Sequence, residues 1–226
     1  MSSIANPSYR KRPLYHATLL ASMGLFASFI MVLGNIATRE DINLRIKEDM
    51  QASLEQVIPS TLHDNDLFED TFTFTTKIKL SQTEQVKVYR AREKNKIMAI
   101  AFESSAVGYS GDIKVIMGVN MKGELLGVRV ISHAETPGLG DKIEIKKNDW
   151  ITKFTGLSRL NPPPEKWKVK KDGGYFDQFT GATITPRAVV KAVHKGLIFF
   201  SEIKQKNTFE TNIADSKEIS DENISK

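Results

Sequence analysis

The stretch that decides the fold runs from residue 97 to residue 132 and reads IMAIAFESSAVGYSGDIKVIMGVNMKGELLGVRVIS. It holds three runs rich in β-branched and aromatic residues, and residues 121–124 between the last two have the composition of a tight turn. Two similar runs precede this stretch, and Lys94-Asn95 supplies turn chemistry between the second run and the third. The five predicted strands are Phe72–Lys79, Val86–Arg92, Ile97–Glu103, Ile113–Val119 and Leu125–Ser132.

Closely spaced strands joined by short turns favour antiparallel pairing. We therefore predict an α+β fold, in which a largely antiparallel sheet carries flanking helices at its edges. A helix is predicted over residues 187–200, with Val189, Val193 and Leu197 along the side that packs on the sheet. Residues 168–170 are a further candidate strand, placed before a turn at Asp172-Gly173-Gly174.

Residues 17–37 read ATLLASMGLFASFIMVLGNIA and are uncharged and mostly apolar, which predicts one transmembrane helix. Basic residues at 10–12 precede it, whereas Arg39 is followed by two acidic residues. The positive-inside tendency then predicts a single-pass protein of a bacterial inner membrane, with residues 1–16 in the cytoplasm and the chain after Thr38 in the periplasm. A cleaved signal peptide is the alternative. The stretch is longer than a usual signal core, and Asn35 with Ala37 makes a poor cleavage site, so an uncleaved anchor is favoured.

The segment from residue 38 to residue 60 has apolar side chains at nearly helical spacing and ends at Pro59. We predict a linking amphipathic helix that packs on the domain, with a membrane-surface helix as the alternative. The domain itself is placed at residues 61–203. Residues 204–226 are polar and mixed in charge, and we predict a disordered tail there.

The composition excludes several classes of protein. The net charge is +5 and the pI is about 9.2, but basic and acidic residues are interspersed, so nucleic-acid binding is rejected. The chain has no cysteine, which excludes disulfides, thiolate nucleophiles and Cys-ligated clusters. Its four histidines lie far apart without metal-ligand spacing, so no metal site is predicted. Any redox role must therefore belong to a bound organic cofactor.

The stretch DQFTGATITP at residues 177–186 places small hydroxyl residues in a Gly-Ala turn before a helix. Thr185 has the character of an N-cap, and Pro186 suits the first helical position. Helix amides and the positive end of the helix dipole would then point toward Thr183, an environment that favours an attached phosphate. By local chemistry alone, a tight turn before a capped helix explains the same residues, and Thr180 and Thr185 are rival acceptors to Thr183.

A second loop, HAETPGLGDK at residues 133–142, follows the last predicted strand. Pro137, Gly138 and Gly140 prevent regular structure and allow the backbone to approach a ligand closely. Taken alone, such a Pro-Gly loop is more often structural than functional. The GYSG sequence at residues 108–111 precedes a strand and is a weaker third candidate.

These motifs carry a resemblance. The pattern Asp-x-x-Thr-Gly-Ala-Thr resembles the acceptor motif of proteins whose last threonine, here Thr183, is esterified to flavin mononucleotide (FMN) by a flavin transferase. HxETPGLGD resembles the second hallmark of flavin-carrying subunits of membrane redox complexes. With its single anchor, the chain resembles the G subunit of the Rnf-type ion-translocating electron transport complex. The related C subunit of the Na⁺-translocating NADH:quinone reductase is the alternative, and the short distance between anchor and domain favours the Rnf-type family.

The resemblance implies a covalently flavinylated electron carrier whose partners are integral-membrane, iron–sulfur and flavin subunits of one complex, besides the flavin transferase. It implies FMN joined through its phosphate to Thr183, with Asp177 positioning the incoming donor or its metal. Leu139 would touch the flavin ring, Thr136 would donate a hydrogen bond, and Lys142 would stabilise a reduced, anionic flavin. The implied cofactor site consists of Asp177, Thr180, Gly181, Ala182, Thr183, Thr185, His133, Glu135, Thr136, Gly138, Leu139, Gly140 and Lys142.

Two of these residues have alternative roles. Glu135 either contributes to the cofactor site or braces its loop through backbone contacts, and His133 is either a proton donor or a residue that fixes the loop. No independent catalysis is expected, since one membrane span provides no ion path and no Rossmann glycine fingerprint occurs. The alternative function of another class is a membrane-tethered binding or scaffold domain without flavin; a regulatory flavoprotein is a third.

Overall fold

The computed structural model describes residues 13–80, 84–206 and 209. Contacts divide the chain into two compact units, Met1–Asp49 and Met50–Lys226. Of the predicted cytoplasmic segment 1–16, residues 1–12 lie outside the described residues. Of the predicted tail 204–226, only residues 204–206 and 209 are described.

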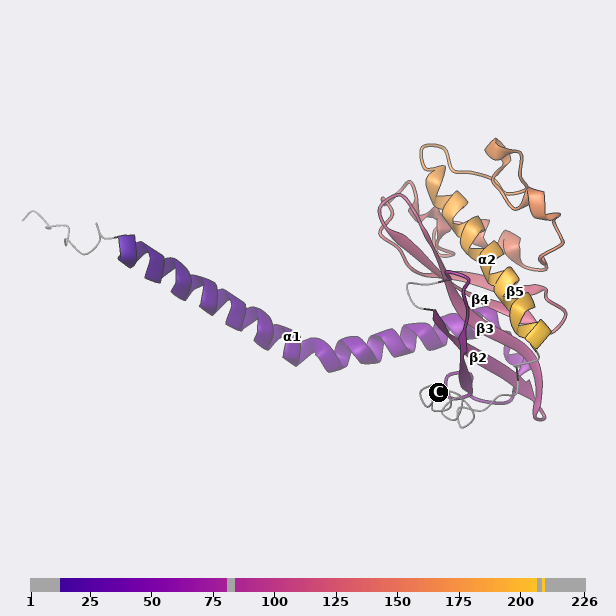
Figure 1. The fold of residues 1–226 in the computed structure, drawn as a ribbon, viewed down its shortest axis with the longest axis horizontal. Coiled ribbons are helices and arrows are strands. Elements are labelled where there is room, and N and C mark those ends of the chain that lie inside the picture. Colours follow the sequence, from indigo (N-terminus) through magenta and orange to yellow (C-terminus); the bar gives the residue numbers. More distant parts are fainter. Residues whose placement is uncertain (1–12, 81–83, 207–208, 210–226) are drawn as a thin grey trace, which may run out of the picture. The chain divides into compact units, whose positions relative to one another are not determined.

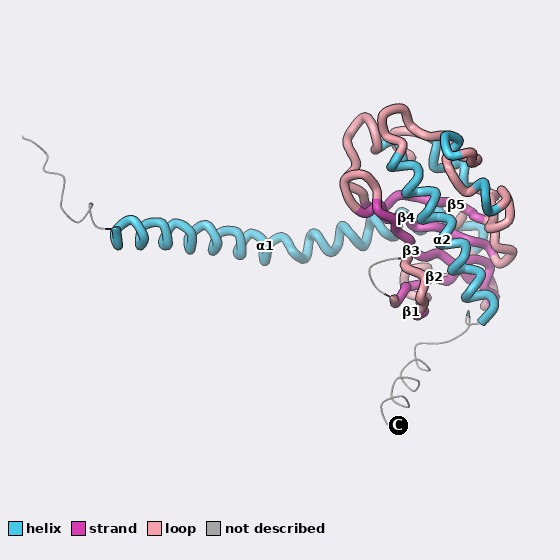
Figure 2. Tube along the Cα trace, turned by 45° about the horizontal axis from the view of Figure 1, so that its top comes forward, coloured by secondary structure: helices cyan, strands magenta, loops and turns pink. Residues whose placement is uncertain are grey.

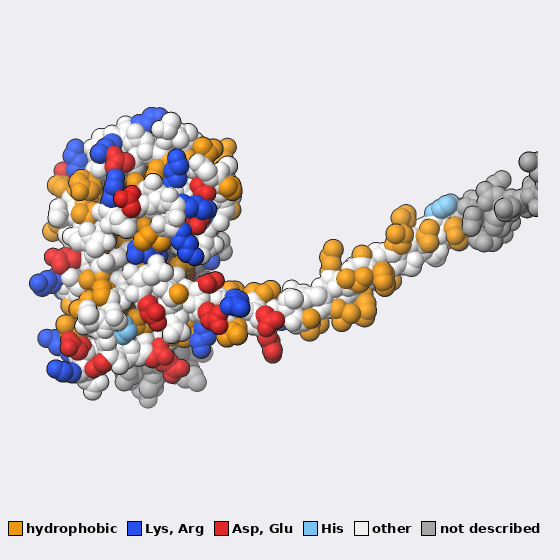
Figure 3. Space-filling view, turned by 180° about the vertical axis from the view of Figure 1, so that it is seen from behind, with side chains coloured by type: hydrophobic (Ala, Val, Ile, Leu, Met, Phe, Trp, Pro, Cys, Tyr) orange, Lys and Arg blue, Asp and Glu red, His pale blue; other side chains and the backbone are white. Residues whose placement is uncertain are grey.

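The N-terminal helix α1 spans Pro13–Val57, so the predicted transmembrane and linking helices belong to one helix. Among the described residues it is the one helix long and apolar enough to cross a membrane. Its apolar side chains in the first unit are exposed, as Figure 3 shows along the extended helix; Phe26 is 67% exposed and Met31 75%. Helix length and composition therefore fit a single span.

The second unit is built on one five-stranded sheet in the order β1-β2-β3-β4-β5, in which every neighbouring pair is antiparallel. Figures 1 and 2 show the strands side by side beneath helix α2. The strands are β1 (Thr71–Thr75), β2 (Gln85–Glu93), β3 (Lys96–Val107), β4 (Asp112–Asn120) and β5 (Leu125–Ser132). The predicted α+β fold with an antiparallel sheet is confirmed.

Strand β1 ends at Thr75, four residues earlier than predicted. The reason lies in the hydrogen bonds of the Thr76 hydroxyl, which accepts from the Ile78 amide and donates to Glu202 on α2. This side-chain bond to the backbone turns the chain away from the sheet. Leu80 then enters the core and is fully buried.

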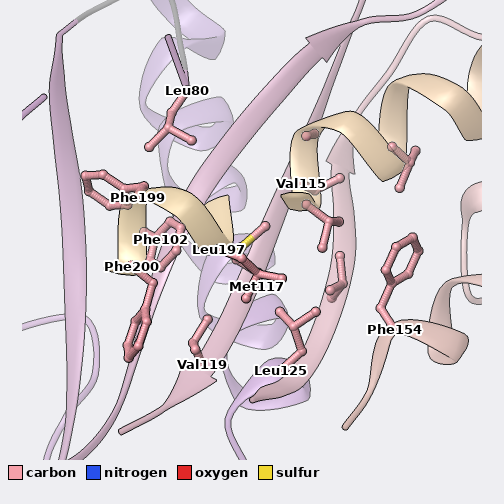
Figure 4. Close-up of a cluster of buried hydrophobic side chains, with 14 of the residues drawn as sticks. Leu80, Phe102, Val115, Met117, Val119, Leu125, Phe154, Leu197, Phe199 and Phe200 are labelled. Carbon is pink, nitrogen blue, oxygen red and sulfur yellow. The ribbon is translucent and has the colours of Figure 1, made fainter. Parts of the chain in front are cut away.

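Helix α2, Ile184–Lys206, covers one face of the sheet and buries the predicted apolar side. Its closest neighbours are β3 and β4, and Gly196 lies directly above Met117. Figure 4 shows the resulting cluster, in which Phe199 packs edge-on against Phe102 with ring centroids 4.9 Å apart. A buried apolar layer therefore joins α2 to this face of the sheet.

The opposite face of the sheet is covered by the last two turns of α1. Leu54 and Val57 are fully buried there, together with Ile58 just after the helix. Gly118 and Gly127 face them from β4 and β5, and a side chain at Gly118 would overlap the Val57 carbonyl oxygen. Glycine at these positions therefore allows the helix backbone to lie directly on the strands.

Residues 141–183 contain short 3₁₀ helices and loops, which aromatic side chains join to the core. Trp150, Phe154 and Phe176 pack together there, with the Phe154 and Phe176 ring centroids 4.5 Å apart. The predicted strand at 168–170 is wrong. Val169 makes only an isolated bridge with Phe176, because a 3₁₀ turn at Lys170–Asp172 and Gly173 in a left-handed conformation (φ 79°) fold the chain back at once.

Candidate functional site

Three loops meet at one edge of the sheet. The loop at 108–111 joins β3 to β4, the loop at 133–140 follows β5, and the turn at 180–183 precedes α2. In an antiparallel sheet the end of β3, the start of β4 and the end of β5 lie at the same edge, which explains why segments far apart in sequence come together.

One side chain, Glu135, connects its own loop to the loop at 108–111 and to the start of α2. Its Oε1 accepts hydrogen bonds from the backbone amides of Tyr109 at 2.9 Å and Ser110 at 3.1 Å. Its Oε2 accepts a short hydrogen bond from the hydroxyl of Thr185 in the first turn of α2. Glu135 is only 5% exposed, so these donors replace water around its carboxylate. Its contacts with backbone amides are those of the predicted bracing role, and Glu135 also lines the cavity described below.

Two glycines allow the loops to close over this carboxylate. A Cβ at Gly108 would lie 2.5 Å from Glu135 Oε1. A Cβ at Gly140 would lie 2.9 Å from the Thr185 hydroxyl oxygen and 2.9 Å from the Glu135 Cβ. Such distances are well inside van der Waals contact, so Gly108 and Gly140 leave room for Glu135 that a side chain at either position would take.

The loops enclose an open cavity of about 290 Å³. Its wall combines exposed apolar side chains with backbone and hydroxyl groups; Tyr109 is 71% exposed, Leu139 46% and Ile184 45%. The lining residues are Tyr109, Glu135, Thr136, Leu139, Gly140, Gly181, Ala182, Thr183, Ile184 and Thr185. An apolar wall with a few convergent polar groups is typical of a cofactor site.

Helix α2 begins at Ile184, which makes Thr183 the residue at the N-cap position. The Thr183 carbonyl accepts a hydrogen bond from the Arg187 amide at 3.4 Å, as the first bond of a helix does. The prediction that Thr185 is the N-cap is wrong, as is the placement of Pro186 at the first helical position. Thr185 lies inside the first turn because its hydroxyl is bonded to Glu135 rather than to the helix backbone.

The three threonines of the stretch 177–186 differ in their surroundings. Thr183 is partly exposed and lines the cavity. Thr185 is 1% exposed and its hydroxyl is occupied by Glu135. Thr180 is exposed but lies outside the cavity lining. Between Thr180 and Thr183, Gly181 adopts a φ of +82°, a left-handed conformation that directs the chain from Thr180 into the cavity.

Known proteins similar to this chain were found along nearly its whole length. The G subunit of the ion-translocating oxidoreductase complex of Cereibacter sphaeroides is 48% identical over 194 residues, covering 85% of this chain and 86% of that protein. The corresponding protein of Shewanella piezotolerans is 44% identical, covering 87% of this chain and 93% of that protein. The chain belongs to this family, the G subunits of Rnf-type complexes. The family predicted from the motifs is confirmed.

Residues 108–198 match the FMN-binding domain family. This match includes every residue of the cavity lining. A solved structure of the C subunit of Na⁺-translocating NADH-quinone reductase from Parabacteroides distasonis overlays on 78% of this chain and 97% of its own, with 18% identity and a TM-score of 0.49. An overlay this loose adds nothing to the assignment.

Several residues of the predicted site lie outside the cavity lining of the G-subunit domain. His133 fixes its loop, because Nδ1 accepts from the Glu135 amide at 3.1 Å and Nε2 is 2.9 Å from Glu144 Oε1. These contacts fit a neutral ring that donates from Nε2, with no hydrogen bond directed into the cavity. Lys142 and Gly138 also lie outside the lining.

Asp177 is bound to two lysines. Its carboxylate oxygens lie 2.7 Å from Lys153 Nζ and 2.6 Å from Lys170 Nζ, and hydrogen bonds from these lysines lower the pKa of the Asp177 carboxyl. Its carbonyl accepts from the Trp150 indole at 2.9 Å. The Asp177 charge is thus already paired in this structure, which fits an anchor of the turn at 180–183 better than a free metal ligand.

Two cavity residues were missed by sequence reasoning. Ile184 and Tyr109 present exposed apolar surface to the cavity beside the predicted Leu139. The GYSG motif pointed to the Tyr109 loop without indicating the ring itself. No sequence signal marked Ile184, since its exposure depends on where α2 begins.

Proposed function

We propose that this chain is the FMN-carrying electron-transfer subunit of an Rnf-type ion-translocating oxidoreductase complex, with FMN esterified through its phosphate to Thr183. The family assignment and the FMN-binding domain match support a flavin electron carrier. The covalent link is supported by the position of Thr183. Of the three threonines in the stretch 177–186, it is the one that both lines the cavity and is accessible.

The described residues fit a phosphate bound to Thr183. A helix leaves its first amides without intrahelical acceptors, so Ile184 and Thr185 present N–H groups near the N-cap. A phosphodiester carries one negative charge, and the positive end of the α2 dipole stabilises it there. Gly181 and Ala182 leave the approach to the Thr183 side chain unobstructed by larger groups.

The cavity wall also fits a flat, mostly apolar ring system. Leu139, Ile184 and Tyr109 offer exposed apolar surface, and the Thr136 side chain supplies a polar group beside it. When bound, flavin supplies the redox chemistry of accepting and passing on electrons. The protein's residues hold the phosphate, orient the ring and shield part of it from water. An ester bond keeps the cofactor in place without requiring a tight pocket.

A labelling experiment tests the covalent link. The full chain, co-produced with a flavin transferase, is denatured and separated on a gel, and flavin fluorescence is recorded in its band. We expect a fluorescent band for the wild type and none for Thr183→Ala. The matched control Thr180→Ala should retain fluorescence, because Thr180 lies outside the cavity. A non-fluorescent wild type from its native host would favour a binding or scaffold domain without flavin.

We further propose that α1 anchors the domain in the inner membrane with its N-terminus in the cytoplasm, so that the flavin faces the periplasm. The basic residues before the apolar stretch support this orientation. The absence of cysteine makes the test direct, since an introduced cysteine is the single label site. In intact spheroplasts, a membrane-impermeant maleimide should label Lys122→Cys on the β4–β5 turn and leave Ser3→Cys unlabelled. The reverse pattern would refute the orientation.

The partners in this proposal are the other subunits of the complex and a flavin transferase. The relatives are named as the G subunit of a complex, which supports such an assembly for this chain. Co-purification of the full chain from native membranes should recover integral-membrane subunits in constant ratio. A chain that purifies alone in mild detergent would contradict this part of the proposal.

A further inference from the structure

Glu135 is a buried carboxylate on the cavity wall that is held entirely by hydrogen-bond donors. Two backbone amides and one hydroxyl point at its oxygens. Donors on all sides are the pattern for an ionised carboxylate, which can only accept hydrogen bonds. No ion pair found among the described residues includes Glu135, so no cation at contact distance neutralises its charge there.

The three donors come from two elements that border the cavity, the loop at 108–111 and the first turn of α2, and Glu135 itself belongs to a third, the loop at 133–140. Tyr109 contributes both its amide to Glu135 and its ring to the lining. Thr185 lies in the first turn of α2, two residues after Thr183 at the N-cap position. A displacement of the Glu135 carboxylate would therefore move the Tyr109 loop and the turn at 180–183 together.

We propose that Glu135 is a positioning residue that holds Thr183 in place for attachment of flavin and whose negative charge lowers the flavin's reduction potential. This inference depends on the proposed function. Reduction adds electron density to the flavin, and a fixed negative charge in a site partly shielded from water makes that addition less favourable. The helix dipole at Thr183 acts in the opposite sense, so Glu135 offsets part of it.

Two substitutions separate the contacts of Glu135 from its charge. In Glu135→Gln the side-chain oxygen still accepts from the two amides, and the new N–H₂ group donates to the Thr185 oxygen, so the contacts persist without the charge. In Glu135→Ala both are lost. The full chain is co-produced with a flavin transferase, and Thr180→Ala serves as the control because it alters an exposed threonine of the same motif.

We expect Glu135→Ala to lower the flavinylated fraction at a fixed time by about tenfold or more, the range for loss of a charge-assisted hydrogen bond. Glu135→Gln should keep most of the label, and spectroelectrochemical titration should give it a more positive midpoint potential than the wild type. Thermal melting of unlabelled protein checks that each variant is folded. A structural role alone would change the melting temperature without changing the potential of the loaded Glu135→Gln protein.

The results distinguish the two proposals. A wild-type chain without covalent flavin would refute the proposed function itself. If the wild type is labelled and Glu135→Ala is labelled to the same extent, the positioning role is refuted. Loss of label in Glu135→Gln as large as that in Glu135→Ala would also refute it, because glutamine keeps the contacts. An unchanged potential in loaded Glu135→Gln would refute the electrostatic role.

Discussion

Replacement of Thr185 by valine tests whether the buried bond to Glu135 stabilises the domain. Valine matches the shape of threonine but has no hydroxyl, so Glu135 Oε2 loses the donor that the structure gives it. Since Glu135 is 5% exposed, water replaces that donor poorly. Loss of a hydrogen bond to a charged group costs about 1.5–3 kcal/mol, which is the expected decrease in the free energy of unfolding.

The assay is thermal unfolding of the unlabelled full chain in detergent, followed by circular dichroism. For a domain of this size each kcal/mol lowers the melting temperature by about 2–4 °C, so Thr185→Val should melt about 3–12 °C below the wild type. The matched control Thr180→Val changes an exposed threonine and should stay within about 0.5 kcal/mol of the wild type. Thr185→Val and Thr180→Val have the same amino-acid composition, so only the position of the substitution differs.

A double-mutant cycle then assigns the effect to the pair. If the stabilisation by the Thr185 hydroxyl depends on Glu135, the cost of Thr185→Val should shrink in a Glu135→Ala background, which lacks the bond, with a coupling of about 0.5–3 kcal/mol. The claim that this bond joins the helix to the loop would be refuted if Thr185→Val melted at the wild-type temperature. It would also be refuted if Thr185→Val lowered the free energy of unfolding equally in both backgrounds.

Three further predictions follow from other contacts. Gly108→Ala should reduce flavin labelling of Thr183, measured by in-gel fluorescence, because its Cβ would lie 2.5 Å from Glu135 Oε1; full labelling would contradict the requirement for glycine. Gly118→Ala should lower the free energy of unfolding in urea by about 1–3 kcal/mol or more, because its Cβ would overlap the Val57 carbonyl; an unchanged midpoint would mean that α1 does not lie on the sheet. Burial lowers the pKa of His194, and the nearby charge of Arg159 lowers it further. The folded state therefore favours the neutral ring, so the stability of the domain falls as the pH drops below 6.5, the ordinary pKa of histidine. His194→Phe, which keeps a ring stacked on Trp167, should lose less stability between about pH 7.5 and about pH 5.5 in urea unfolding, and an equal loss would contradict this sign.

The sheet was predictable from sequence because its signals are local. Runs of β-branched residues separated by glycine-containing turns identify strands without knowledge of their partners, and β5 has the predicted bounds. The end of β1 was not predictable, since it depends on a hydrogen bond from Thr76 to Glu202 on α2, a contact between residues 126 positions apart.

The segment 141–183 was largely inaccessible to such reasoning. Its 3₁₀ helices have no helical or alternating period, and aromatic contacts between distant residues, such as Trp150 with Phe179, hold them in place. The candidate strand at 168–170 failed for this reason: Val169 is buried as in a strand, but its partner lies in the same short loop.

The site shows where local rules stop. Thr-Pro at residues 185–186 is a strong signal for a helix start, yet a hydrogen bond to Glu135, fifty residues earlier, places Thr185 inside the helix. Thr183 and Leu139, which the two sequence motifs singled out, both line the cavity. Sequence spacing gave no sign that Asp177 is paired with Lys153 and Lys170.

The measurement that tests the account most directly is mass spectrometry of natively produced protein. Trypsin cleaves after Lys171 and Arg187, so one peptide, residues 172–187, contains all three candidate threonines. The account predicts that this peptide carries the mass of one FMN less one water, with fragment ions that place it on Thr183. The unmodified peptide mass, or a label on Thr180 or Thr185, would contradict it.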